Sequence, residues 1–115
     1  MTTRFYLVFW KPGNAWTEGS YFEQPIVSHS KYVAMHYKKG TVLMAGPLAN
    51  GSADVTVLQM ESMEQAKKWA NRDPAVALDI LVPDIKEIRL ADWSKMIRSG
   101  GYSFLESPQA VSRRG

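Results

Sequence analysis

Residues 4–10, Arg-Phe-Tyr-Leu-Val-Phe-Trp, decide the fold of this chain. The run is aromatic and β-branched and contains neither glycine nor proline, so it predicts a buried strand. Because side chains alternate along a strand, the run presents two apolar faces. These are Phe5, Leu7 and Phe9 on one face and Tyr6, Val8 and Trp10 on the other. Both faces of the predicted strand therefore need a covering layer.

A helix is predicted over residues 25–39, after a long loop that starts at Lys11-Pro12-Gly13-Asn14 and runs to about Gln24. Pro25 suits a first helical turn, and Ser28 would cap a slightly later start. Two lysines followed by Gly40 are typical of a helix end. The stripe of this helix that faces the core is predicted to be Val27, Ser30, Val33, Ala34 and Tyr37.

Three more strands are predicted from short apolar runs bounded by turn residues. They cover residues 41–45, 54–60 and 85–90. Gly46-Pro47 ends the first of these strands, and the short link through Asn50-Gly51 favours an antiparallel hairpin with the second. Between the hairpin and the last strand, Ser62 to Gln65 forms a capping box that opens a second helix through Ala70. Asp73-Pro74 ends that helix and starts a further short one.

The resulting order, β-α-β-β-α-β, predicts an α+β fold: a ferredoxin-like plait. Its four-stranded antiparallel sheet carries both helices on one face, so the other face of the first strand is left open. An open apolar face needs a partner. We therefore expect a homodimer, or a higher homo-oligomer, packed sheet to sheet.

Size, composition and charge limit the possible functions. The 115 residues form one domain, and no apolar run approaches the ~20 residues that span a bilayer. The chain has no cysteine, and its start does not resemble a signal peptide, so we expect a cytoplasmic protein without membrane contact. The net charge of +3 comes from the last 22 residues, because residues 1–93 hold ten basic and ten acidic side chains. We therefore assign this positive charge to a solvated tail and do not predict a nucleic-acid groove.

Five short motifs follow one another in a recognisable order: His29, Gly40, Gly46-Pro47, Ser62 with Ala66 and Trp69, and Asp73-Pro74-Ala75-Val76-Ala77. Over residues 4–92 their order and spacing resemble the YCII-related family. The resemblance implies a dimeric α/β barrel, which agrees with the plait and dimer predicted above. We expect the YCII-like domain to cover residues 1–93, and residues 94–115 to form a C-terminal extension that is partly docked or flexible.

In the resembling family a His and an Asp meet in the cleft, which implies that His29 and Asp73 are catalytic. His29 lies near a helix N-terminus, where the helix dipole opposes protonation, so we expect a neutral imidazole that accepts a proton. Asp73 before Pro74 is an ordinary helix cap. One of its oxygens can cap while the other orients His29. Without the resemblance, a surface histidine and a capping aspartate would be the simpler interpretation.

Other residues are predicted to line the same pocket and bind a small-molecule ligand. They are His36, Ser28, Trp16, Gly46 and Pro47. Three of them have an ordinary alternative: His36 as a packed side chain, Ser28 as a cap, and the loop around Trp16 as a buried connection or a dimer contact. No metal site is predicted, because two histidines seven residues apart match no known zinc motif.

Two departures from the family pattern bear on the ligand. Many members carry a basic residue shortly before the His, where this chain has Gln-Pro-Ile-Val at positions 24–27, and an aromatic often follows Asp-Pro, where this chain has Ala75. A roomier pocket, less suited to anions, is expected.

Two functions from different classes follow. The first is a cofactor-independent enzyme in which the His-Asp dyad performs general acid/base chemistry on a small cyclic or aromatic compound. Isomerisation, elimination and hydrolysis all belong to this class. The second is a non-catalytic ligand-binding or accessory dimer, since fold alone does not decide function.

Overall fold

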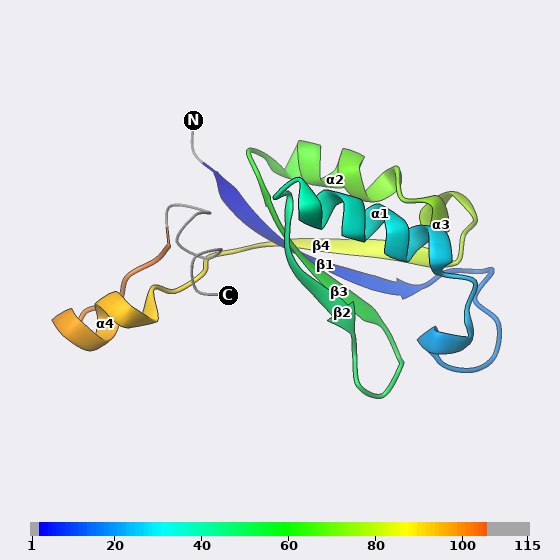
Figure 1. Ribbon diagram of the computed structural model, residues 1–115, viewed down its shortest axis with the longest axis horizontal. Coiled ribbons are helices and arrows are strands. Elements are labelled where there is room, and N and C mark those ends of the chain that lie inside the picture. Colours follow the sequence, from blue (N-terminus) through cyan, green and yellow to red (C-terminus); the bar gives the residue numbers. More distant parts are fainter. Residues whose placement is uncertain (1–2, 106–115) are drawn as a thin grey trace.

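The computed structural model describes residues 3–105. Its central sheet has the strand order β2-β3-β1-β4, and all three pairings are antiparallel. Figure 1 shows the helices α1, α2 and α3 together on one side of this sheet. The elements are β1 (Arg4–Pro12), the 3-10 helix η1 (Tyr21–Glu23), α1 (Val27–Lys38), β2 (Val42–Pro47), β3 (Asp54–Met60), α2 (Met63–Asn71), α3 (Pro74–Ala77), β4 (Leu81–Ile88) and α4 (Trp93–Ser99). The predicted ferredoxin-like βαββαβ fold is confirmed.

The two faces of β1 have the two environments that its sequence predicts. Tyr6, Val8 and Trp10 are fully buried beneath the helices and form the centre of the core. On the opposite face Phe5 is buried, whereas Leu7 and Phe9 remain half-buried. That face has no covering helix, so part of its apolar surface stays open in the single chain.

Local signals fixed the second helix and the short helix after it. Ser62 caps α2 by accepting the Gln65 backbone N–H at 3.2 Å, and the Gln65 side chain accepts in return from the backbone N–H of Glu61, one residue before the cap. Asp73 caps α3 through the Ala75 N–H, with Pro74 in the first helical position. The chain direction at both helix starts is therefore set by residues that the sequence identifies.

Two predicted element starts were wrong. The last strand begins at Leu81 and not at residue 85, so it contains Pro83. This proline is tolerated because β4 is an edge strand, where a missing backbone donor can face away from β1. Helix α1 begins at Val27 with Ile26 in the capping position, and no side chain caps it, so the predicted capping role of Ser28 is also wrong.

Of the predicted inward stripe of α1, Val33 packs against the core, and the rest of the stripe was wrong by about one position. The buried residue of this helix is His29, and Tyr32 packs beside it against the core. Val27 and Tyr37, both predicted to be inside, are 67% and 63% exposed. The stripe was predicted from apolar spacing and left out His29, whose hydrogen bonds to Asp54 and Asp73 allow it to be buried.

Residues 89–105 extend away from the sheet and fold back on themselves (Figure 1). Asp92 caps α4 by accepting the Lys95 N–H, and Gly100 ends the helix at φ 71°. A bridge between Ala91 and Phe104 closes the segment, and the Arg89 guanidinium lies 3.6 Å from the centre of the Phe104 ring. The sequence prediction missed this helix, and the rest of the predicted extension, residues 106–115, lies outside the described residues. None of the described helices is long and apolar enough to cross a bilayer.

Trp10 offers a test of the core. Its indole N–H donates to the Thr56 hydroxyl at 2.8 Å, and both side chains are fully buried. We expect Trp10→Phe to lower the free energy of unfolding by about 2–4 kcal/mol, through lost volume and an unpaired hydroxyl. The same change at Trp93, which is 60% exposed, should cost less than about 0.5 kcal/mol. Urea unfolding measures both, and equal losses would contradict this account of the core.

Candidate active site

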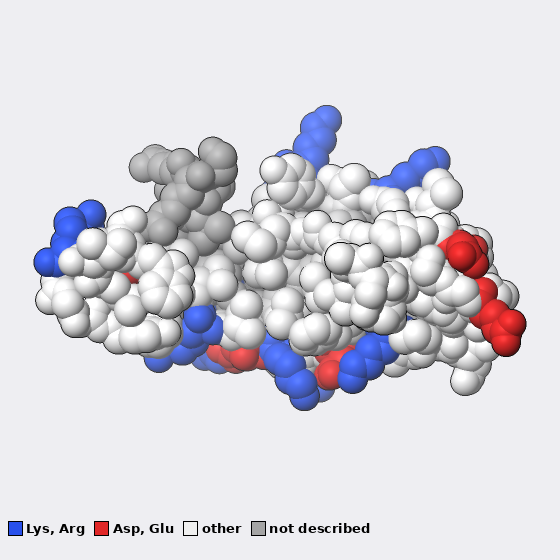
Figure 2. Space-filling model, turned by 90° about the horizontal axis from the view of Figure 1, so that it is seen from below, with Lys and Arg blue, Asp and Glu red and all other residues white. Residues whose placement is uncertain are grey.

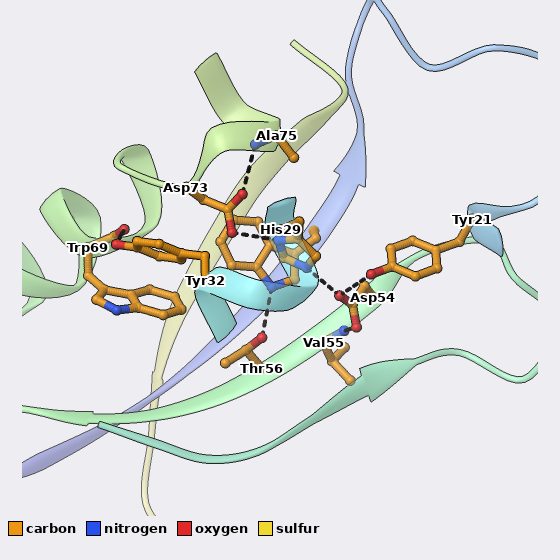
Figure 3. A network of polar contacts seen from close by, with 10 residues as sticks. Tyr21, His29, Tyr32, Asp54, Val55, Thr56, Trp69, Asp73 and Ala75 are labelled. Atoms are coloured by element: carbon orange, nitrogen blue, oxygen red, sulfur yellow. Dashed lines mark hydrogen bonds and ion pairs between the residues drawn. The ribbon is translucent and has the colours of Figure 1, made fainter. Parts of the chain in front are cut away.

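The predicted contact between His29 and Asp73 is present. The imidazole Nδ1 lies 2.5 Å from Asp73 Oδ2, and both side chains are almost completely buried. The other oxygen of Asp73, Oδ1, accepts the backbone N–H of Ala75 at 2.8 Å. One carboxylate therefore caps α3 and holds His29 at the same time, as Figure 3 shows.

A second carboxylate, which the sequence prediction missed, binds the opposite side of the imidazole. His29 Nε2 lies 2.7 Å from Asp54 Oδ2, and the Tyr21 hydroxyl donates to the same oxygen at 3.0 Å. Asp54 Oδ1 accepts the backbone N–H of Val55 at 2.8 Å. His29 is thus the centre of a bridge between two buried carboxylates (Figure 3). We call His29, Asp54 and Asp73 the carboxylate–imidazole cluster.

The sheet register places Asp54 in this cluster. Asp54 is the first residue of β3 and pairs with Trp10 of β1, so its side chain lies on the helix-covered face of the sheet. The Trp10 ring in turn packs edge-on against the His29 ring, with 4.9 Å between centroids. One sequence signal marks Asp54: it is the only Asp, Glu, Lys or Arg between Lys39 and Glu61.

The protonation state of His29 differs from the sequence expectation. Burial lowers the pKa of His29, but the hydrogen bonds and charges of Asp54 and Asp73 outweigh burial and raise the pKa to about 9. The predicted neutral imidazole is therefore wrong, since two adjacent carboxylates have more effect than the helix dipole. For Tyr21, burial and the neighbouring Asp54 raise the pKa well above its usual value. The cluster rests as an imidazolium between two carboxylates.

A pocket of about 540 Å³ opens beside this cluster, between α1 and β2. Tyr21, His29 and Asp54 supply its buried polar groups, whereas Asp73 lies behind the imidazole and does not line it. The predicted ligand-binding residues Gly46 and Pro47 belong to the β2 wall of this pocket. Its volume falls in the usual range for small-molecule sites, roughly 300–1,000 Å³.

The other predicted ligand-binding residues lie elsewhere. His36 contacts Tyr32 and Trp69 and lines a separate surface hollow between the helices. Burial, and then the charge of Lys39, lower the pKa of His36. Ser28 is exposed outside the pocket, and Trp16 packs near Tyr21 with its indole N–H donating to the Gly19 carbonyl. The structure therefore brings Gly46 and Pro47 to the cluster, but not His36, Ser28 or Trp16.

A bound metal ion has no evident place in this arrangement. Within residues 3–105, no group of three or more His, Cys, Asp or Glu side chains is arranged to hold one. In the carboxylate–imidazole cluster itself, a carboxylate oxygen faces each ring nitrogen of His29. The arrangement instead suits the movement of protons between closely spaced acid and base groups.

The chain matches the YCII-related domain over residues 15–89, more than half of its length. The matched range contains His29, Asp54 and Asp73, and it ends at residue 89, directly after β4. No curated protein matches the chain.

The raised pKa of His29 makes stability depend on pH in a defined direction. The folded state keeps the proton up to about pH 9, whereas an unfolded His loses it near 6.5. The stabilisation is therefore complete below pH 6.5 and is lost as the pH rises through about 9. We expect the free energy of unfolding to fall by about 3 kcal/mol across this range.

Chemical unfolding at a series of pH values measures this loss. His29→Gln should remove the pH dependence between these limits, and His36→Gln should retain it, because His36 lies outside the cluster. A wild-type stability that stays constant from pH 6.5 to 9 would contradict the bridged imidazolium.

Proposed function

The chain belongs to the YCII-related family, and on this premise we propose that it is a small enzyme that moves protons on an apolar substrate without a cofactor. One observation carries the proposal: a buried imidazolium lies between two carboxylates at the wall of a pocket large enough for a small molecule. Such an arrangement supplies an acid and a base within a few ångströms of each other. Isomerisation and elimination on a small cyclic or aromatic compound fit it best.

The three side chains of the cluster have different roles in this proposal. Asp73 is a positioning residue, because it holds Nδ1 of His29 from behind and does not line the pocket. His29 and Asp54 line the pocket and are the catalytic pair. Since the pKa of His29 is about 9, the imidazolium acts first as the general acid, and Asp54 acts as the base.

The proton balance of an isomerisation follows from these roles. A substrate carbonyl inserts between His29 and Asp54 and replaces their mutual hydrogen bond. Asp54 takes a proton from the carbon beside the carbonyl, the C–H pair forms the C=C bond, and the carbonyl oxygen receives the Nε2 proton of His29. When a C=C bond adjoins the enol, protonated Asp54 gives its proton to the far carbon of that bond, the double bonds shift, and the re-forming carbonyl returns its O–H proton to Nε2 of His29. Asp54 and His29 thereby regain their resting protonation states, and their 2.7 Å contact re-forms when the product leaves.

A second candidate is a ligand-binding or accessory module in which the cluster is structural. The observation that favours it is the completeness of the hydrogen bonding: both ring nitrogens of His29 are occupied and the side chain is only 1% exposed. A buried ion pair of this kind can specify the fold without chemistry. The two candidates differ in one property. Only the enzyme turns over a substrate at a rate that depends on the protonation of His29.

The open face of the sheet is the proposed site of dimer formation. Leu7 pairs with Val57, and Phe9 with Val55, so four half-buried apolar side chains lie together on this face. Beside them the Lys11–Asp84 ion pair, at 3.0 Å, forms a polar margin. An apolar centre with a polar rim is the usual anatomy of a protein interface. We propose that a second copy of the chain covers it, as the dimeric α/β barrel of the family implies.

Solvent deuterium exchange tests the enzymatic proposal without a known substrate. Small cyclic ketones and lactones are incubated with the protein in D2O, and proton NMR follows the loss of the C–H signal beside the carbonyl. We expect His29→Gln to slow the exchange by roughly 10²–10⁴-fold. The wild-type rate should fall as the pH rises through about 9, because the general acid is then lost.

Two variants keep this test decisive. Asp73→Asn preserves the shape of the cap and should also reduce the rate, while His36→Gln should leave it unchanged. Circular dichroism establishes that each variant is folded. An unreduced rate in folded His29→Gln, or a rate indifferent to pH across the His29 transition, would favour the binding module.

The proposed dimer is tested by a charge on the open face. Leu7→Asp places a carboxylate at the centre of the apolar patch, so we expect the protein to sediment as a monomer. Val27→Asp is the matched control, because Val27 is 67% exposed on α1. Sedimentation equilibrium distinguishes the two species. A wild-type protein that is monomeric, or a Leu7→Asp variant that stays dimeric, would contradict this interface.

A further inference from the structure

Apart from His29 and Asp54, the residues that line the pocket beside the cluster carry no charge. Ser30, Val33, Ala34 and Tyr37 of α1 form one wall, and β2 forms the other. Among the described residues that line it, none is a lysine or an arginine, and Asp54 is the only carboxylate. A bound anion would therefore find His29 as the one cation among these residues, and two carboxylates already pair with it.

The sequence of the β2–β3 hairpin explains this absence. From Gly40 to Met60 the single charged residue is Asp54, and it is 4% exposed. β2 and β3 are the lowest strands in Figure 1, so Figure 2, which looks from below, sees their side of the molecule. Charged side chains gather along the margins of that view and leave its middle uncharged (Figure 2). The centre of this side of the molecule therefore carries few charges.

The cluster itself adds a negative charge. It contains two carboxylates and one imidazolium, so its formal sum is −1 at neutral pH. Asp54 lines the pocket, and its oxygens already accept from His29, Tyr21 and the Val55 N–H. A carboxylate has about four acceptor positions and no donor, so one position is left for a donor group of a ligand. A like charge brought against this group is repelled, and more strongly in an apolar cavity than in water.

We propose that this pocket binds an apolar molecule that carries no negative charge and that presents a hydroxyl or amino group to Asp54. Where the bound ligand is also the substrate of the proposed enzyme, this inference rests on the proposed function. The Asp54 carboxylate binds the donor group of the ligand, and residues of α1 and β2 contact its apolar body. Carboxylate-bearing or phosphate-bearing compounds are excluded by charge and not by size.

Three probes of similar size separate the possibilities: benzyl alcohol, benzylamine and benzoate. Each is titrated into the full-length, isotopically labelled protein, and NMR follows the methyl signals of Met44 and Ala34, which line the pocket. We expect the alcohol and the amine to shift these signals with saturation. Benzoate should bind at least about tenfold more weakly than benzyl alcohol.

A matched pair of variants assigns the selectivity to the pocket. Met44 lines the pocket and is 57% exposed, whereas Met35, 47% exposed on α1, does not line it. Met44→Lys should improve benzoate binding about tenfold and weaken benzylamine binding, because it adds a cation that no carboxylate of the cluster pairs with. Met35→Lys should change neither affinity.

Every outcome bears on the proposal. Benzoate binding as tight as benzyl alcohol, no pocket binding by any probe, or identical effects of the two lysine variants would overturn it. The expected pattern without His29-dependent deuterium exchange would refute the enzymatic function and leave the ligand class standing. His29-dependent exchange that is faster on carboxylate-bearing ketones than on neutral ones would refute the ligand class alone.

Discussion

The hydrogen bonds on both sides of the His29 imidazole are the interaction on which the rest of the structure depends. They connect helix α1 to the start of α3 through Asp73 and to the start of β3 through Asp54. A buried charge is tolerated only when it is paired and hydrogen-bonded, so the three segments must lie where they do. Trp10 and Tyr21 complete the enclosure, one by packing against the ring and the other by donating to Asp54.

The same bridge gives the site its chemical character. Two carboxylates hold the imidazole protonated at neutral pH, so His29 begins as an acid, and the group left to act as a base is the carboxylate on the pocket side. Asp73 and Asp54 are similar in their bonds to His29 but differ in position. Asp73 is behind the ring and doubles as a helix cap, whereas Asp54 borders a pocket whose described lining residues include no lysine or arginine. Reactivity and ligand charge are therefore set by one arrangement.

Particular residues show how much of the structure could be predicted from the sequence. The aromatic strand at residues 4–10, the capping box at Ser62 and the Asp73-Pro74 helix start each depend on neighbours within a few positions, and each was found where predicted. The errors have a different origin. The start of β4 was missed because Pro83 is acceptable only on an edge strand, and the stripe of α1 was missed because His29 is buried by partners distant in sequence. The helix at Trp93–Ser99 did have local signals, Asp92 and Gly100, that were overlooked.

The sequence by itself determined the fold class, the order of the elements, the likeness to the YCII-related family and the pairing of His29 with Asp73 that this likeness implies. Only the tertiary structure decided that Asp54 completes the cluster and that His29 is protonated, and that His36, Ser28 and Trp16 lie away from the pocket. The physical reason is the range of the interactions involved. Capping, turn formation and strand alternation act between near neighbours, whereas the pKa of His29 depends on carboxylates 25 and 44 residues away. The register of β1 against β3 places Asp54, and the packing of α1 beside α3 places Asp73. No local sequence pattern specifies either.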